Sequence, residues 1–365
     1  MAQDAGWGGA PYGGPPGWGP WAPPPKPGVI PLAPLKLGDI LGGAFSTLGR
    51  YWKQLFGMGA VVFGGALAIM VVTVVIAYSV VSGHLHTVFS LSADEEPRSS
   101  DVIPLVVGLG VICLLAVIVF SVATAMMYAT VPTVLQEAVL GRPTTFSAVW
   151  RRAWSRVPTV IGTVILTYLI AMIPMVLMVA GFFALVIGAI TLAHDTGATL
   201  WVVLGFLGAF ATAPLAIWLC VKFCLAPSAA VFEGQSAVAA LRRSAQLVRG
   251  DWWRIFGTGL LALVLASVAS YIVQIPFSFL GMFSGVIGGT TLDEDPNPTA
   301  IVFAMSGYMV IMALGQLVSQ FITAVFPPLV TGLLYVDRRM RTENLGPALA
   351  EAAGVPAQPG PRYGF

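Results

Sequence analysis

The stretch FSAVWRRAWSRVPTVIG, residues Phe146 to Gly162, joins a short basic segment with two tryptophans to the beginning of a long apolar run. Arginine and tryptophan together are typical of the boundary between membrane and water. Similar boxes end at Gly57, where the chain reads TLGRYWKQLFG, and at Gly257, where it reads QLVRGDWWRIFG. The three boxes predict three places where the chain passes from a polar surface into lipid.

The composition of the whole chain indicates a membrane setting. Of the 365 residues, 57% are hydrophobic and 9% are charged, whereas an average soluble domain carries about 25% charged residues. We therefore expect the bilayer to be the solvent of this chain. The formal net charge of +2 gives no reason to expect binding to nucleic acid. The preference for Arg over Lys, with much Ala, Gly and Val, is typical of a GC-rich bacterial genome.

Six apolar runs are long enough for helices that cross the membrane, since a crossing needs about 20 residues. They are residues 58–81, 102–130, 159–192, 200–225, 255–287 and 300–335. The third and fifth runs contain Pro174 and Pro276 and are longer than one perpendicular helix requires. Each predicts either a helix that tilts and kinks at the proline or a short interfacial piece after it.

The charges between these runs predict the orientation. If the chain starts in the cytoplasm and crosses six times, every Lys and Arg except Arg98 falls on the cytoplasmic side, while the opposite loops are mostly acidic. Cytoplasmic loops of membrane proteins are enriched in Lys and Arg. We therefore predict a multi-pass protein of the plasma membrane with both termini in the cytoplasm.

The boxes also predict an internal repeat. Their terminal glycines recur at intervals of about 100 residues, and a proline followed by an acidic residue comes after the second helix of each pair. The acidic residues are Glu137, Glu233 and Asp337. We predict an all-α integral membrane fold in which six transmembrane helices form three parallel repeats, each an amphipathic helix plus a helical hairpin.

The ends of the chain differ from its middle. Residues 1–28 are rich in Gly, Pro and Trp, which predicts a disordered cytoplasmic tail. Residues 29–342 form the predicted six-helix membrane domain, and residues 343–365 a flexible cytoplasmic tail. The prolines at the start of the domain keep it extended until helical periodicity begins at Leu37.

The helix that begins at Leu37 is predicted to be amphipathic. Five apolar residues fall near one of its faces: Ile40, Leu41, Phe45, Leu48 and Trp52. Such a helix either lies on the membrane surface or packs under the bundle of crossing helices.

The basic boxes are the first candidate site, because Arg and interfacial Trp suit anionic lipid headgroups at the inner leaflet. The candidate contacts are Arg50, Lys53, Arg151, Arg152, Arg156, Arg242, Arg243, Arg249 and Arg254. The same cations also determine topology and anchor the helices, with or without specific lipid recognition.

Three glutamines inside the apolar runs are the second candidate site. Gln274 lies beside Pro276, and Gln316 and Gln320 lie one helical turn apart. They are spaced to face each other across the third hairpin, either as interhelical hydrogen bonds or as part of a polar path. No charge lies near the middle of a predicted span, which disfavours a proton-coupled carrier with a buried relay.

Catalytic signatures are missing from the sequence. It contains no phosphate-binding loop, no nucleophile elbow and no HExxH motif. The three cysteines lie in apolar runs and are expected to be packing residues, and His84 and His86 are expected to be surface histidines rather than a metal pair. We predict no catalytic residue, no metal site and no cofactor.

The segment PGVIPLAPLKLGDILGGAFSTLGRYWKQLFG, residues 27–57, resembles the start of a group of actinobacterial multi-pass proteins. These are described by similarity to the membrane domain of glycerophosphoryl diester phosphodiesterase. The resemblance extends over roughly residues 27–342, and LGDILGGAF is its most specific part. It implies a six-helix membrane domain. In fused relatives a catalytic barrel accompanies that domain; the barrel is absent from this sequence, so the resemblance implies no activity.

These observations favour a scaffold, or a module that interacts with membrane lipids or with a membrane-protein partner. The alternative is a transporter or lipid-handling permease built from the threefold repeat. An enzyme is the least favoured class.

Overall fold

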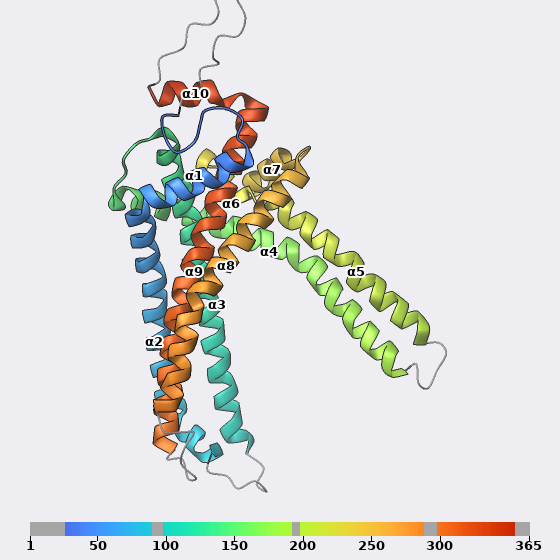
Figure 1. Ribbon diagram of the computed structural model, residues 1–365. Helices are drawn as coiled ribbons and strands as arrows, with labels where there is room; N and C mark the ends of the chain where they lie inside the picture. The colour runs from blue at the N-terminus through green and yellow to red at the C-terminus, as the bar shows by residue number, and fades with distance from the viewer. Residues whose placement is uncertain (1–25, 90–97, 192–197, 288–297, 355–365) are drawn as a thin grey trace, which may run out of the picture.

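A computed structural model of the protein describes residues 26–89, 98–191, 198–287 and 298–354. Within these ranges the chain is helical and has no strand (Figure 1). The helices are α1 (Leu37–Arg50), α2 (Trp52–Phe89), α3 (Ser99–Leu140), α4 (Phe146–Thr191), α5 (Ala198–Phe223), α6 (Ala226–Glu233), α7 (Ala237–Val248), α8 (Trp252–Ile287), α9 (Pro298–Glu343) and α10 (Leu345–Ala352).

Six of these helices are long and apolar enough to cross a membrane: α2, α3, α4, α5, α8 and α9. At most 28% of the most apolar window of any of them is buried. A helix that is apolar on all sides and largely uncovered requires lipid around it. The predicted all-α membrane fold with six crossing helices is therefore confirmed.

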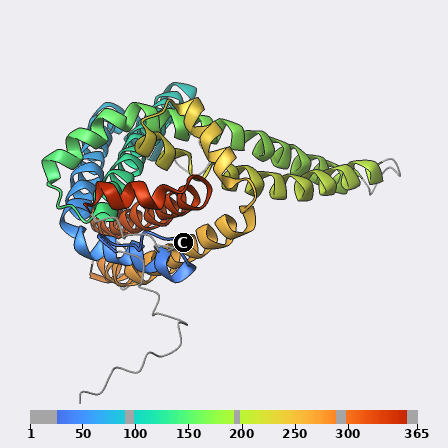
Figure 2. The ribbon, with the colours of Figure 1, turned by 90° about the horizontal axis from the view of Figure 1, so that it is seen from above.

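The crossing helices pair in sequence as three hairpins, α2–α3, α4–α5 and α8–α9. Helix α9 contacts both α2 and α3, so the first and third hairpins form one four-helix bundle. The α4–α5 hairpin, called the arm below, extends away from this bundle (Figures 1 and 2). The two helices of the arm touch closely, since a Cβ on Gly205 would lie 2.5 Å from the backbone nitrogen of Leu185.

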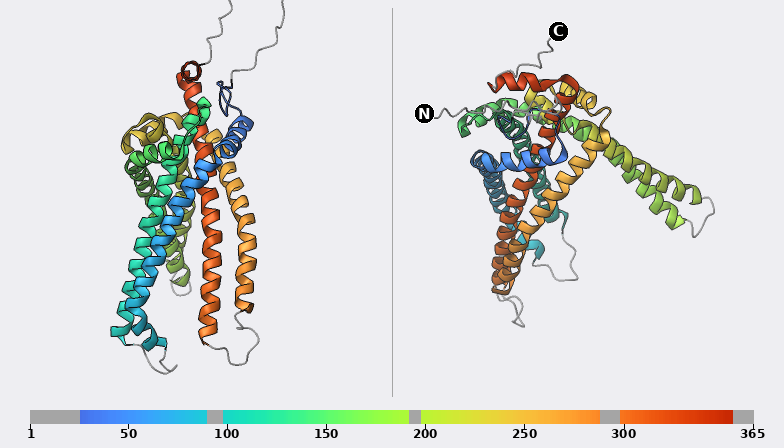
Figure 3. Two further views of the ribbon diagram at one scale, coloured as in Figure 1. Left: turned by 90° about the vertical axis from the view of Figure 1, so that its left-hand side faces the viewer. Right: turned by 45° about the horizontal axis from the view of Figure 1, so that its top comes forward.

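The shorter helices gather at one end of the bundle (Figure 3). We call this layer the cap; it consists of residues 26–51, α6, α7, α10 and the adjoining ends of the long helices. Most of the fully buried large side chains lie here, among them Ile30, Leu135 and Tyr335. The first and last described residues also lie at this end, as an even number of crossings requires (Figure 1).

Helix α1 packs onto the bundle, against α9, which decides between the two placements considered for it. Its buried face is formed by Ile40, Gly43, Ala44 and Thr47, while Phe45 stays more than half exposed. The buried face is thus offset from the more apolar side of the helix, on which Leu41 and Leu48 are half-buried. Small residues take the inner face because a Cβ on Gly43 would lie 2.6 Å from the Ile30 side chain.

The second predicted repeat departs from the other two. Separate short helices, α1 and α7, precede α2 and α8, but the basic stretch from Phe146 is the first part of the continuous helix α4. The chain turns before α8 through Gly250, whose φ of +95° suits glycine. The box at Phe146 to Gly162 has no glycine before its last residue, so no such turn interrupts the helix there. The prediction of a separate amphipathic helix in the second unit is therefore wrong. The threefold repeat as a whole stays a prediction.

The long apolar runs continue as helix through their prolines. Helix α4 extends past Pro174 to Thr191, and α8 extends past Pro276 to Ile287. Residues 345–352, part of the stretch predicted as a flexible tail, instead form α10, whose Leu345 and Leu349 pack against the core. Of the tail predicted as disordered, residues 1–28, residues 1–25 lie outside the described residues. Residues 26–28 are placed, and Gly28 lies so close to α3 that a Cβ on it would be 2.1 Å from the carbonyl oxygen of Ala138.

Candidate lipid-headgroup site

The predicted cations divide into two groups in the structure. Arg152, Arg243 and Arg254 form ion pairs in the cap, and of these three Arg152 is exposed. Five further predicted cations are exposed on the surface: Arg50, Lys53, Arg151, Arg242 and Arg249. Arg156 lies between the two groups and donates a hydrogen bond of 3.4 Å to the carbonyl of Gly234.

Asp337 is the centre of the most buried ion pair, with no exposed surface. Its carboxylate accepts hydrogen bonds from Arg254 at 2.7 Å, from Arg341 at 3.0 Å and from the backbone N–H of Leu35 at 2.8 Å. Both arginines also donate to the carbonyl of Leu35, at 2.7 and 2.8 Å. This network fixes the extended segment of residues 26–36, called the strap, against the ends of α8 and α9.

Glu233 is the centre of a second cluster, which joins α6, α7 and α9. Its carboxylate accepts hydrogen bonds from Arg243 at 3.0 Å and from the hydroxyl of Tyr335. Arg243 also pairs with Glu343. Burial alone would lower the pKa of Arg243, but the two carboxylates outweigh it, so that its pKa lies above the usual value.

Arg338 holds the turn between α7 and α8. Arg338 is only 7% exposed. Its guanidinium donates hydrogen bonds to the carbonyls of Leu247 at 2.8 Å and Arg249 at 3.3 Å, and it also forms an ion pair with the carboxylate of Asp251. The turn therefore has a defined backbone shape, although the side chain of Arg249 itself is exposed.

The acids marked by the repeat pattern all pair with cations of the basic boxes. Glu137 binds Arg152 at 2.8 Å, Glu233 binds Arg243, and Asp337 binds Arg254. Sequence reasoning recorded both sets of residues but did not connect them, and it missed the roles of Arg338 and Arg341. The recurrence of an acid after each hairpin was the available signal.

The exposed cations have exposed tryptophans beside them. Trp52, Trp154 and Trp253 are 53%, 57% and 78% exposed. Trp52 and Trp253 lie in the first turns of α2 and α8, and Trp154 lies in the third turn of α4. The ammonium of Lys53 lies 6.0 Å from the ring centre of Trp52. We call this set the belt: Trp52, Trp154 and Trp253 with Arg50, Lys53 and Arg151. It combines apolar rings and positive charge at the level where the long helices leave the cap.

The three glutamines lie apart from this surface, along α8 and α9. The Gln274 side-chain oxygen accepts a hydrogen bond of 3.1 Å from Ser319, and Ser319 and Ser270 exchange hydrogen bonds at 3.2 Å. Gln316 is exposed and Gln320 half-buried, and in the described residues neither is bonded to Gln274. The polar contact between these helices is thus made mainly by serines.

Metal-ligating residues do not cluster in the described part of the chain, where no three of His, Cys, Asp and Glu come together. The side chain of His86 lies outside the described residues.

The fold and this surface together define an all-helical membrane protein. A family model described as "Domain of unknown function (DUF7847)" matches residues 45–336, and the chain belongs to this family. The matched region contains the three hairpins and ends one residue before Asp337. No curated protein and no solved structure matches the chain.

Proposed function

We propose that the protein is a non-catalytic module of the plasma membrane that holds anionic lipid at the inner leaflet through its cap. The observation that carries this proposal is the belt. Its cations are exposed and, within the described residues, have no acidic partner, while other cations of the same boxes are ion-paired. Each basic residue near an anionic membrane surface contributes about 1 kcal/mol.

The orientation belongs to the same proposal. With the cap in the cytoplasm, the belt lies at the inner leaflet and Arg98, at the start of α3, lies on the opposite side. Single cysteines at Lys36 and Thr87, in a background with the native cysteines replaced by serine, test this. An impermeant thiol reagent added to intact cells should label the second position only. Labelling of Lys36→Cys from outside would reverse the proposed orientation.

Lipid retention tests the belt directly. The purified protein is exposed to a mixture of phosphatidylglycerol and phosphatidylcholine in detergent, and the retained lipids are counted by native mass spectrometry. We expect phosphatidylglycerol to be preferred, and the double variant Lys53→Gln/Arg151→Gln to retain fewer phosphatidylglycerol molecules per protein, because it lacks two cations that contribute about 1 kcal/mol each. Added salt should weaken the preference, because salt screens exposed charges.

Arg98→Gln is the matched control, since it removes one exposed cation at the opposite end of the helices. It should retain lipid like the wild type. A wild-type protein that takes up both lipids equally would refute the proposed function.

A lipid-handling permease is the second candidate. The divergence of the arm from the four-helix bundle favours it, because a moving hairpin is one way to open a path for a headgroup (Figure 2). Proteoliposomes with fluorescent phosphatidylglycerol and an impermeant quencher decide between the two candidates. Faster loss of inner-leaflet fluorescence than in protein-free vesicles would support the permease. A rate of fluorescence loss equal to that of protein-free vesicles would favour the non-catalytic module.

A further inference from the structure

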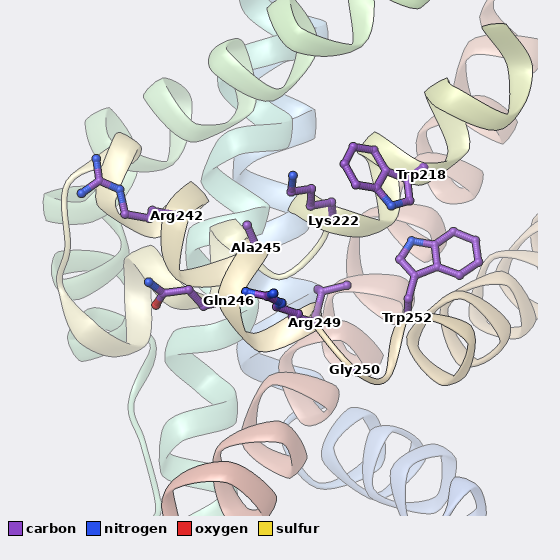
Figure 4. A pocket seen from close by; sticks show the side chains of 9 residues that line it. Trp218, Lys222, Arg242, Ala245, Gln246, Arg249, Gly250 and Trp252 are labelled. Atoms are coloured by element: carbon purple, nitrogen blue, oxygen red, sulfur yellow. The ribbon is translucent and has the colours of Figure 1, made fainter. Parts of the chain in front are cut away.

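A pocket of about 540 Å³ lies in the cap where α5, α7 and the start of α8 meet (Figure 4). Trp218 and Lys222 reach it from the last turns of α5, Arg242 from α7, Arg249 from the turn that follows, and Trp252 from the first turn of α8. The pocket thus collects side chains from three elements that are separate in the sequence.

The lining of this pocket is positively charged. It contains the cations Lys222, Arg242 and Arg249, and no acidic residue is among the described residues that line it. The ammonium of Lys222 lies 4.3 Å from the ring centre of Trp218. The nearby carboxylate of Asp251 is already paired with Arg338. Three cations around one hollow, without a protein counter-charge, favour an anionic ligand.

A second observation points to the same kind of ligand. The indole nitrogen Nε1 of Trp252 is buried, and in the described part of the chain it has no hydrogen-bond acceptor. A buried donor without an acceptor is costly, so such donors are normally satisfied. Because the indole of Trp252 lines the pocket, a small shift of its ring would bring this N–H to an acceptor oxygen of a bound ligand.

The backbone around the pocket is held by other residues, which leaves the lining side chains available. Arg338 fixes the turn that carries Arg249 through the carbonyls of residues 247 and 249. The hydroxyl of Ser244 donates to the carbonyl of Lys222 at 2.8 Å and so ties α7 to the end of α5. The backbone that carries the lining side chains is therefore positioned before any ligand arrives, which lowers the entropy cost of binding.

The position of the pocket distinguishes a lipid from a free anion. Helices α5 and α8 diverge on the side of the pocket away from the cap (Figure 1). Both helices expose large apolar side chains along their length, such as Phe210 and Leu263. A ligand whose headgroup occupies the pocket would find apolar helix surface for acyl chains next to it.

We propose that this pocket binds the phosphate-bearing headgroup of an anionic phospholipid, with its acyl chains along α5 and α8. The proposal rests on the proposed function and goes further, because it assigns one lipid to one site instead of a general charged surface. Arginine and lysine supply charge-assisted hydrogen bonds to phosphate oxygens, and Trp252 supplies one more donor.

The test compares two double variants that remove the same charge. Arg242→Gln/Arg249→Gln changes the pocket, and Lys53→Gln/Arg151→Gln changes the belt. Phosphatidylglycerol is titrated into each detergent-solubilised protein, and the most tightly held lipid is followed by native mass spectrometry. We expect the affinity for this lipid to fall roughly 10- to 30-fold in the pocket variant, because two lining cations at about 1 kcal/mol each are lost. In the belt variant it should fall by no more than about threefold, because Lys53 and Arg151 do not line the pocket and salt screens their charge. A thermal unfolding midpoint within the wild-type range shows that each variant is folded.

Trp252→Phe keeps an aromatic ring and removes the unpaired N–H. We expect its affinity for phosphatidylglycerol to fall at least roughly tenfold, as the loss of one hydrogen bond to a charged group predicts. Unchanged affinity in Trp252→Phe would remove the indole from the proposed site.

The remaining outcomes separate the two proposals. An equal fall in both double variants would overturn the pocket while leaving the general inner-leaflet binding of the proposed function. A wild-type protein with no preference for phosphatidylglycerol over phosphatidylcholine would refute the proposed function itself. Glycerol phosphate, the soluble headgroup, is the third probe. If it displaces the lipid and binds as tightly, the site takes a free phosphate ester and the lipid assignment is wrong.

Discussion

The cap and the arm are built by different physical rules. In the cap, Asp337 has no exposed surface and its oxygens are all taken up by arginines and a backbone N–H. In the arm, Tyr168 and Phe210 are more than 60% exposed, and α4 and α5 meet through close backbone approach at Gly205. Polar networks therefore specify the arrangement at the cap, whereas lipid covers the arm and small residues pair its helices.

Removal of the charge at the centre of the cap should have the largest effect. Asp337→Asn leaves Arg254 and Arg341 without a carboxylate, and breaking a buried ion pair costs about 3–5 kcal/mol. We expect a clearly lower unfolding midpoint in detergent and earlier proteolysis at the strap, whose anchor at Leu35 is weakened when both arginines lose their carboxylate. Glu351→Gln, an exposed acid on α10, is the control. A normal midpoint and a protected strap in Asp337→Asn would mean that the network does not hold the cap together.

Gly205 tests whether the arm depends on close packing, and Gly110 of α3, in the four-helix bundle, is its control. In Gly205→Ala the new Cβ would lie 2.5 Å from the backbone of α4, so the helices must separate. We expect a loss of about 1–3 kcal/mol in stability, as is typical of overpacking. In Gly110→Ala nothing lies within 4 Å of the new Cβ, and better helix propensity should add up to about 1 kcal/mol. The two thermal unfolding shifts should therefore have opposite signs; shifts of the same sign would contradict the packing argument.

Arg243→Lys tests the electrostatics of the Glu233 cluster as a function of pH. Arginine stays charged at all ordinary pH values, but lysine has an unperturbed pKa of about 10.4. Next to Glu233 and Glu343 the folded-state pKa of such a lysine should be raised, as that of Arg243 is. Its contribution to stability is then complete below the unfolded pKa and is lost as pH rises through the folded pKa.

The measurement is the unfolding midpoint between neutral pH and pH values above about 10. The variant should lose about 1 kcal/mol more than the wild type across this range. An identical pH profile for the two proteins would show that Arg243 contributes little charge interaction.

Loss of belt charge should have the smallest effect on folding. Lys53→Gln/Arg151→Gln alters exposed side chains without ion pairs in the described structure, so the free energy of unfolding should change by no more than about 0.5 kcal/mol. Lipid retention should fall in the same sample. If stability falls as it does in Asp337→Asn, the belt is part of the folded cap rather than a lipid contact.

Much of the fold could be predicted from periodicity, length and charge. The six apolar runs became six crossing helices, and the cationic residues between them gathered in the cap, since burial of charge in lipid is too costly to permit otherwise. Helix continuation through Pro174 could not be decided, because a proline in a membrane helix is tolerated when neighbouring groups satisfy the freed carbonyl. The side of α1 that packs on the core could not be predicted, because it contains Gly43 and Thr47, which are not apolar residues but allow close approach.

Only part of the candidate site could be predicted from the sequence. The predicted lipid-headgroup contacts include both Arg151, which is exposed, and Arg254, which is ion-paired with Asp337. These two look alike in a linear pattern, since both lie in a tryptophan-bearing box. Their roles differ because the partners of Arg254 come from residues 35 and 337, at opposite ends of the domain.

The sequence by itself determined that the chain is a membrane protein with six crossing helices and that nearly all of its cationic residues lie at one end of them. These properties follow from transfer free energies, which each segment carries independently of the others. Only the tertiary structure decided which cations are neutralised, how α1 is rotated, that the arm leaves the bundle, and that Lys222, Arg242 and Arg249 surround one pocket. Such pairings depend on distances between segments far apart in the chain, which local composition and spacing do not encode.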